Sequence, residues 1–171
     1  YPHTSNPLTM TPRIATAADF PQILHLIRES FAYMDARIDP PSSMHRMSVA
    51  SIAGQAETGE IWLIDGPAEP HACVFLTPQG EVLYLGKLAV AAAARGQGLA
   101  RRLVALAEAR ARALGHVALE LQTRVELVEN HAIFAGMGFH RVAETAHPGY
   151  ARATSFTWRK AVGAQAPSSA I

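Results

Sequence analysis

The most constraining feature of the sequence is an apolar strand that leads through a glycine-containing loop into an amphipathic helix. The predicted strand, 82–90, is strongly apolar, as in strands buried within a sheet. The loop contains Gly96 and Gly98, and a helix is predicted over about 98–113 because apolar side chains recur on one stripe. That stripe consists of Leu99, Leu103, Leu106 and Ala113. A buried strand that continues into such a helix favours a mixed α/β domain.

The rest of the chain supplies further strands and helices in alternating order. Strands are predicted at 13–16, 60–64, 72–77, 117–122, 139–144 and 155–159, and helices at about 19–31, 47–56 and 129–135. Asp19 is the expected N-cap of the first helix, with Pro21 just inside it. A length of 171 residues, 49% of them hydrophobic, suits one domain. We therefore expect a single domain over 10–162, with flexible tails at 1–9 and 163–171.

The charge and cysteine content argue against several classes of function. The 15 Lys and Arg residues against 14 Asp and Glu give a net charge of +1, so no overall field attracts nucleic acid. No apolar run is long enough to span a membrane and no signal peptide is evident, so we expect a soluble, cytoplasmic protein. The single cysteine, Cys73, excludes an internal disulfide, and no cysteine cluster or HExxH pair indicates a metal. We expect no metal, nucleic acid or membrane partner.

The loop before the predicted helix has the features of an anion-binding site. Gly96 and Gly98 permit backbone conformations closed to other residues and let a ligand approach closely. The first amides of the helix have no partner within it, and the helix dipole favours negative charge there. Because Arg95, Arg101 and Arg102 lie nearby, a pyrophosphate group would suit this site. The alternative is a glycine-containing loop before an ordinary core helix.

The spacing of the glycines excludes two common phosphate-binding motifs. The Walker pattern is absent, and the dinucleotide pattern GxGxxG would need a small residue at position 101, which is arginine. The segment Arg95-x-x-Gly98-x-Ala100 instead resembles the acyl-CoA signature Q/R-x-x-G-x-G/A of the GNAT superfamily, the acyl-CoA-dependent N-acyltransferases. The segment 129–139 resembles the superfamily's later helix, N-x-x-A-x-x-Y/F-x-x-x-G-F, in a shortened form. Both motifs occur in the family's order, and the resemblance covers 13–159.

The resemblance implies a mixed, mostly antiparallel central sheet with splayed central strands and about four flanking helices. Acetyl-CoA would be the acyl donor, and its pantetheine arm would lie between the splayed strands, paired with the backbone of Leu88, Ala89 and Val90. The pyrophosphate would be held by the loop and first helical turn, made of Arg95, Gly96, Gln97, Gly98, Leu99, Ala100 and Arg101. Asn130 and Phe134 would contact the donor from the later helix. The alternative for Asn130 is an N-cap of that helix.

The implied reaction is direct transfer of an acetyl group to a primary amine, on a small molecule or at a peptide or protein N-terminus. An alkylamine is mostly protonated at neutral pH, so a base must take its proton. The candidates are Glu81, at the start of the donor-binding strand, and Glu120, on the polar side of the neighbouring strand. A surface charge is the alternative for each. Many members carry a tyrosine as general acid where this chain has Phe134, and Tyr150 is the substitute we expect, an exposed loop tyrosine being the alternative.

The resemblance places the acceptor against the first helix and the loop that follows it. Phe31 and Tyr33 would pack on its body, and Asp35 would attract its amine. Tyr84 would line the site from the donor-binding strand. Loop solvation and core packing are the alternatives for these residues.

Two rival functions stay open. One is a non-catalytic acyl-CoA-binding sensor, which Phe134 favours, and the other is an interaction domain that keeps the fold without the donor. Because many family members pair through late strands, a homodimer also stays open.

Overall fold

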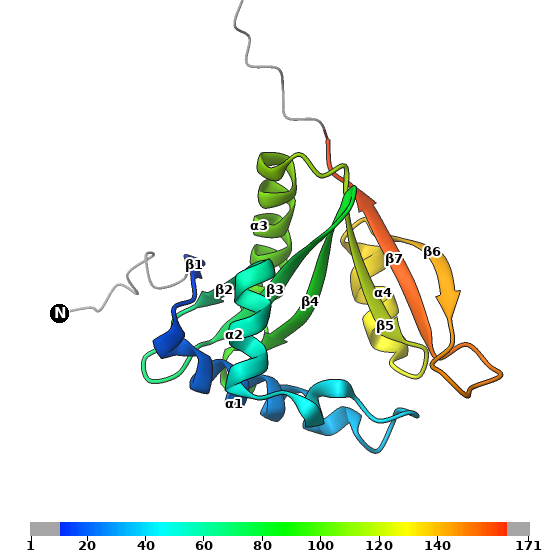
Figure 1. Ribbon diagram of the computed structural model, residues 1–171, viewed down its shortest axis with the longest axis horizontal. Helices are drawn as coiled ribbons and strands as arrows, with labels where there is room; N and C mark the ends of the chain where they lie inside the picture. The colour runs from blue at the N-terminus through cyan, green and yellow to red at the C-terminus, as the bar shows by residue number, and fades with distance from the viewer. Residues whose placement is uncertain (1–10, 164–171) are drawn as a thin grey trace, which may run out of the picture.

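The computed structural model of the chain describes residues 11–163, so the tails predicted at 1–9 and 163–171 lie outside it except for Gly163. Seven strands form one sheet in the order β1-β2-β3-β4-β5-β7-β6 (Figure 1). Neighbouring strands are antiparallel except β4 and β5, which are parallel. This confirms the predicted mixed, mostly antiparallel α/β fold. Within the described residues, no helix is long and apolar enough to cross a membrane.

The elements follow the predicted order along the chain. The strands are β1 (Arg13–Ile14), β2 (Glu60–Ile64), β3 (Ala72–Gln79), β4 (Val82–Val90), β5 (Ala118–Arg124), β6 (His140–Thr145) and β7 (Ser155–Ala161). The α-helices are α1 (Phe20–Phe31), α2 (Val49–Thr58), α3 (Leu99–Leu114) and α4 (Val128–Gly136). Helix α2 begins at Val49, two residues after the predicted start at 47. It begins there because Ser48 and Ser51 form a capping box.

Asp19 occupies the N-cap position of α1 with Pro21 just inside the helix, as predicted, but its side chain makes no capping hydrogen bond to the helix. Its carboxylate accepts a hydrogen bond from the backbone amide of Thr16 at 2.7 Å and forms an ion pair with Arg13 at 2.9 Å. The hydrogen bond from Arg13 lowers the pKa of Asp19 to about 2. Asp19 therefore fixes a 3₁₀ turn, Ala17–Asp19, before the helix and ties it to β1.

Both faces of the sheet are covered, and the side chains of β3 alternate between two cores. Val74 and Leu76 pack in the core under α3, whereas Cys73 and Phe75 pack in the core under α1 and α2. These two sets of helices therefore cover opposite faces of the sheet.

The buried stripe of α3 differs from the predicted one. It consists of Leu99, Leu103, Val104, Ala107 and Ala111, while Leu106 is only partly buried. The buried positions recur every four residues, and Ala113, two positions past Ala111, points away from the sheet and is exposed. Two of these five buried side chains are alanines, which the sequence pattern gave less weight than leucines.

We expect Leu103→Ala to lower the free energy of unfolding by about 2–3 kcal/mol, because it leaves a cavity between α3 and the sheet. Leu103 is fully buried, with 0% of its surface exposed. Urea unfolding of the two purified variants measures the effect. The control is Leu114→Ala, the same change on the same helix at a side chain that is 45% exposed, which should cost less than about 1 kcal/mol. Equal losses in the two variants would contradict the observed packing of α3.

β4 and β5 pair over a short stretch and then diverge. The pairs are Val82–Ala118, Leu83–Leu119 and Tyr84–Glu120. Both strands continue beyond the last pair, and Figure 1 shows them moving apart. Near the same point, the register between β3 and β4 shifts and Lys87 adopts a φ of 51°, a bulge that bends β4. This divergence is the splay that the resemblance implied.

Candidate functional site

A cleft of about 1210 Å³ lies where β4 and β5 diverge. Ligand pockets are typically about 300–1,000 Å³, so this cleft is larger than most. The two strands contribute Tyr84, Leu85, Gly86, Lys87, Leu88, Ala89 and Val90 from β4 and Leu121, Gln122, Thr123 and Arg124 from β5. The other walls are the end of α1 with the loop after it, the first half of α4, and the loop between β6 and β7.

The edge of β4 that faces the cleft carries backbone groups suited to an extended ligand. β3 occupies the other edge, through the pairs Cys73–Ala89 and Ala72–Val90. Among the described strands, none pairs with the cleft edge beyond Tyr84. The structure thus places Leu88, Ala89 and Val90 beside an open strand edge, where a ligand with amide groups can pair.

The cleft reaches the start of α3 at Arg95 and Ala100, which lie on either side of the two glycines. Gly96 and Gly98 have φ values of 80° and 75°, which favour glycine, and an added Cβ would point into open space at either position. The first helical bond runs from the amide of Arg102 to the carbonyl of Gly98 at 3.1 Å, so the amides between them have no acceptor within the helix. Arg95 and Ala100 line the cleft next to this turn. The loop therefore has the geometry of an anion site.

The remaining predicted loop residues differ in their position relative to the cleft. Gln97 and Arg101 are exposed beside the cleft and do not line it. The side chain of Leu99 is 2% exposed and packs in the core, so only its backbone amide faces outward at the helix start.

Two predicted residues of α4 line the cleft. Asn130 is the third residue of the helix, whose N-cap is Leu127, so the alternative of an Asn130 N-cap is wrong. Phe134 packs edge-to-face on Phe139 with ring centroids 5.8 Å apart. An aromatic ring held in this way supplies apolar surface to the cleft and no proton.

Glu120 lies at the closed end of the splay, directly opposite Tyr84 in the strand pairing. Its carboxylate accepts a hydrogen bond from Arg159 of β7 at 2.8 Å, and its side chain is 18% exposed. Tyr84 lines the cleft, and burial together with the negative charge of Glu120 raises the pKa of its phenol. The Glu120 carboxylate therefore lies beside Tyr84, a half-buried residue that lines the cleft, and does not line the cleft itself.

Glu81 lies outside the cleft, contrary to its prediction as a base. It precedes β4 at the end where that strand is still paired with β5, and its carbonyl accepts a hydrogen bond from the amide of Val117 at 2.8 Å. Its side chain is exposed. Glu81 therefore lies at the paired end of the two strands, whereas the lining of the cleft from β4 begins at Tyr84.

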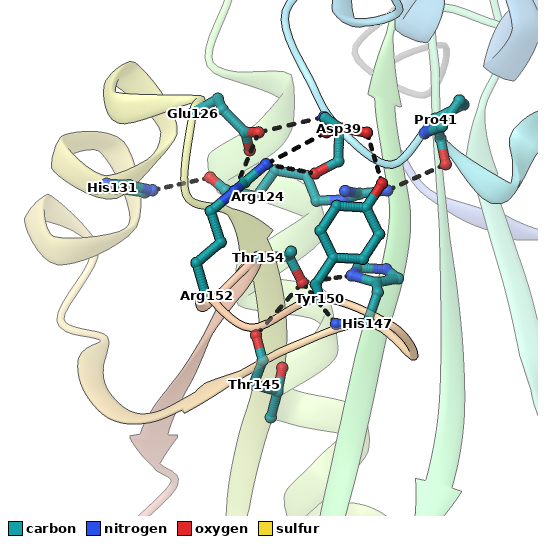
Figure 2. Close-up of polar contacts among 10 residues, drawn as sticks. All are labelled: Asp39, Pro41, Arg124, Glu126, His131, Thr145, His147, Tyr150, Arg152 and Thr154. Atoms are coloured by element: carbon teal, nitrogen blue, oxygen red, sulfur yellow. Dashed lines mark hydrogen bonds and ion pairs between the residues drawn. The ribbon is translucent and has the colours of Figure 1, made fainter.

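Tyr150 lines the cleft, and its hydroxyl donates a hydrogen bond to Asp39 at 2.5 Å (Figure 2). This bond to a carboxylate raises the pKa of the Tyr150 phenol. To protonate a leaving group, the hydroxyl would have to leave Asp39, so the structure does not favour it as the general acid.

Of the predicted acceptor residues at the end of α1 and in the loop after it, only some lie at the cleft. Phe31 lines the cleft and is half-buried. Asp35 does not line it, and its carboxylate lies 2.9 Å from Nε2 of His45. The side chain of Tyr33 lies outside the described part of the structure.

Several polar residues at this end of the cleft were not among the predicted site residues, and Figure 2 shows them close together in separate groups of hydrogen bonds and ion pairs. They come from β5, the turn after it, and the loop between β6 and β7: Arg124, Glu126, His147, Arg152 and Thr154. They are isolated in sequence and follow no motif, so only the fold brings them together. Within residues 11–163, no group of three or more His, Cys, Asp or Glu side chains is arranged to hold a metal ion.

The chain matches the acetyltransferase (GNAT) family model over residues 21–139. That match covers most of the chain, and the chain therefore belongs to the GNAT family of N-acetyltransferases, which use acetyl-CoA. No curated protein sequence matches the chain significantly.

Solved structures share its fold. The ribosomal-protein-S18-alanine N-acetyltransferase of Escherichia coli superposes with a TM-score of 0.67 at 17% identity, covering 94% of this chain and 98% of that one. The PaiA N-acetyltransferase of Thermoplasma acidophilum, solved in complex with coenzyme A, gives 0.74 at 13% identity over 88% and 97%. A GNAT acetyltransferase of Staphylococcus aureus gives 0.71 at 11% identity over 90% and 99%. At these identities the likeness shows the fold alone.

Proposed function

We propose that this chain transfers an acetyl group from acetyl-CoA directly to a primary amine, on a small molecule or at a peptide or protein N-terminus. One observation carries the proposal: a single cleft extends from the glycine turn of α3 to the open edge of β4. An anion site next to an unpaired strand edge matches a donor with a pyrophosphate and an amide-bearing arm.

The donor would lie across the splay. The amides at the start of α3, with Arg95 beside them, would hold the pyrophosphate, and the backbone of Leu88, Ala89 and Val90 would pair with the pantetheine arm. Asn130 and Phe134 would contact the arm from α4. A backbone amide near Leu88 or Ala89 would then donate to the thioester oxygen as it gains charge.

Glu120 is our candidate for the base. It would accept the proton of the amine, directly or through water, as the nitrogen attacks the thioester carbon and the carbon–sulfur bond breaks. The CoA thiolate has a pKa of about 8.5, so it leaves without strong help from an acid, and Phe134 at the usual tyrosine position does not prevent turnover. Positioning of the two substrates in one cleft supplies much of the rate.

The rival function is an acyl-CoA-binding sensor without turnover, which Phe134 favours. Calorimetric titration with acetyl-CoA and CoA, followed by thiol release with a panel of primary amines, separates the two. Binding with turnover of at least one amine is the expected result. Binding without any turnover would favour the sensor, and absence of binding by the folded protein would contradict both. The homodimer and the cytoplasmic location stay predictions.

A further inference from the structure

A short segment after α1, residues 37–41, crosses from one side of the cleft to the other; we call it the arch. It makes contacts with β5, the turn after β5, α4 and the loop between β6 and β7. α1 packs against the half of the sheet that β1 to β4 form. All these partners belong to the other half, which consists of β5, β7 and β6 with α4. The arch therefore spans the splay.

Asp39 is the centre of the arch. Its carboxylate accepts the hydrogen bond from Tyr150 and lies 3.5 Å from Nη2 of Arg152, which also donates to its carbonyl at 3.3 Å. Its backbone amide donates to Glu126 at 3.2 Å. Figure 2 shows these groups converging on Asp39 from two different loops.

Both ends of the arch are also bound. Arg37 donates two hydrogen bonds to Glu129, at 2.5 and 2.9 Å, and lowers the pKa of that carboxylate to about 2. The carbonyl of Pro41 accepts a hydrogen bond from Arg124 at 3.1 Å. Five side chains from the far side thus bind Arg37, Asp39 and Pro41, three of the five arch residues, so the arch cannot be displaced by breaking one contact.

The arch lies on the face of the sheet opposite the proposed donor site, which is the face from which the acceptor would reach the cleft. The glycine turn that we assign to the donor begins α3, on one face of the sheet, whereas the arch continues from α1, on the opposite face. Pro40 and Pro41 of the arch line the cleft together with His147 and Tyr150 of the loop that it contacts. An amine that meets the thioester from the face not taken by the donor must therefore fit beneath the arch.

We propose that the arch restricts the acceptor to small amines and excludes extended peptides and folded proteins. The proposal rests on the proposed function. A peptide longer than a few residues would have to pass through the space that residues 37–41 bridge, and a folded protein could not bring its N-terminus beneath them. The arch thus determines acceptor specificity through contacts between segments that lie far apart in the sequence.

Binding of two bisubstrate conjugates tests the proposal without requiring turnover. In both, the CoA sulfur is joined through an acetyl linker to an amino group, of alanine amide in the short conjugate and of a ten-residue peptide beginning with alanine in the long one. Calorimetry gives the Kd of each conjugate and of CoA. We expect the short conjugate to bind at least tenfold more tightly than the long one. Equal affinities, or a tighter long conjugate, would overturn the proposal.

Opening the arch should remove the discrimination. Asp39→Ala deletes the contacts with Tyr150 and the side-chain contact with Arg152, and the ratio of the two Kd values should fall below about threefold. The matched control is Asp65→Ala, which breaks an ion pair with Arg13 far from the cleft and should leave the ratio unchanged. Tyr150→Phe removes one hydrogen bond to Asp39 without changing a residue of the arch. It should give an intermediate ratio of the two Kd values, and it replaces Asp39→Ala as the test if that variant does not fold.

The outcomes separate the two proposals. A folded Asp39→Ala variant with the wild-type ratio would overturn the role of the arch and leave acetyl transfer intact. Short and long conjugates that both bind no better than CoA would show that no acceptor site lies beneath the arch, which also overturns this inference. Absence of CoA binding, in contrast, would contradict the proposed function itself.

Discussion

Gly98→Asp should weaken acetyl-CoA binding about a thousandfold. Gly98 precedes the first turn of α3, where the helix amides face outward, and an added side chain there enters open space instead of the core. A carboxylate would stand where the pyrophosphate is proposed to bind. Two unit charges about 4 Å apart repel by about 4 kcal/mol at an effective dielectric of 20, which corresponds to about a thousandfold in Kd. Calorimetric titration with acetyl-CoA measures the change.

Gly98→Asn is the matched control. Asparagine has nearly the shape of aspartate and tolerates the same left-handed backbone, but carries no charge. We expect it to weaken binding only about tenfold, from crowding and strain. Since both variants share that strain, the difference between them isolates the charge. If Asp and Asn weakened binding equally, the α3 N-terminus would not be the phosphate site.

Glu120→Gln should lower kcat a few hundredfold with the amine that the panel identifies, while Kd for acetyl-CoA stays within about twofold. The loss follows from removing the proton acceptor, since general-base catalysis contributes about 10²–10⁴ in rate.

Two controls distinguish catalysis from structure. Arg159→Gln breaks the same cross-strand ion pair but keeps the carboxylate, so it should retain most of the activity. Glu81→Gln changes a carboxylate that lies outside the cleft, and it should change kcat less than about twofold. Equal losses in Glu120→Gln and Arg159→Gln would mean that Glu120 acts only through the ion pair. Loss in Glu81→Gln would contradict the placement of the site.

The fold could be predicted closely because local chemistry determines most of its elements. The apolar run at 82–90 located β4, and the glycine turn located the start of α3, so these elements lie where the pattern predicts them. The predicted stripe on α3 failed at Ala113 because burial of alanine depends on the surface opposite the helix, which the sequence pattern does not contain.

The candidate site could be predicted only where it is made by one continuous segment. Leu88, Ala89, Val90 and the loop around Gly98 lie within one strand–loop–helix unit, so their neighbourhood follows from the sequence. Glu81 was a natural candidate by its place on the donor-binding strand, but only the pairing of β4 with β5 shows that it lies at the wrong end. The contact between Asp39 and Tyr150 joins positions 111 residues apart, and no local pattern encodes it.

The short pairing between β4 and β5 also links ligand binding to folding. Three residue pairs join the two halves of the sheet, and beyond them the halves are held together by side chains and by the arch. A ligand that pairs with the open edge of β4 acts as an additional strand and binds only when both halves are in place. Its binding free energy is therefore added to the stability of the whole domain, by about 2.7 kcal/mol at one hundred times its Kd. A donor bound as we propose would thus complete the sheet at the place where β4 and β5 diverge.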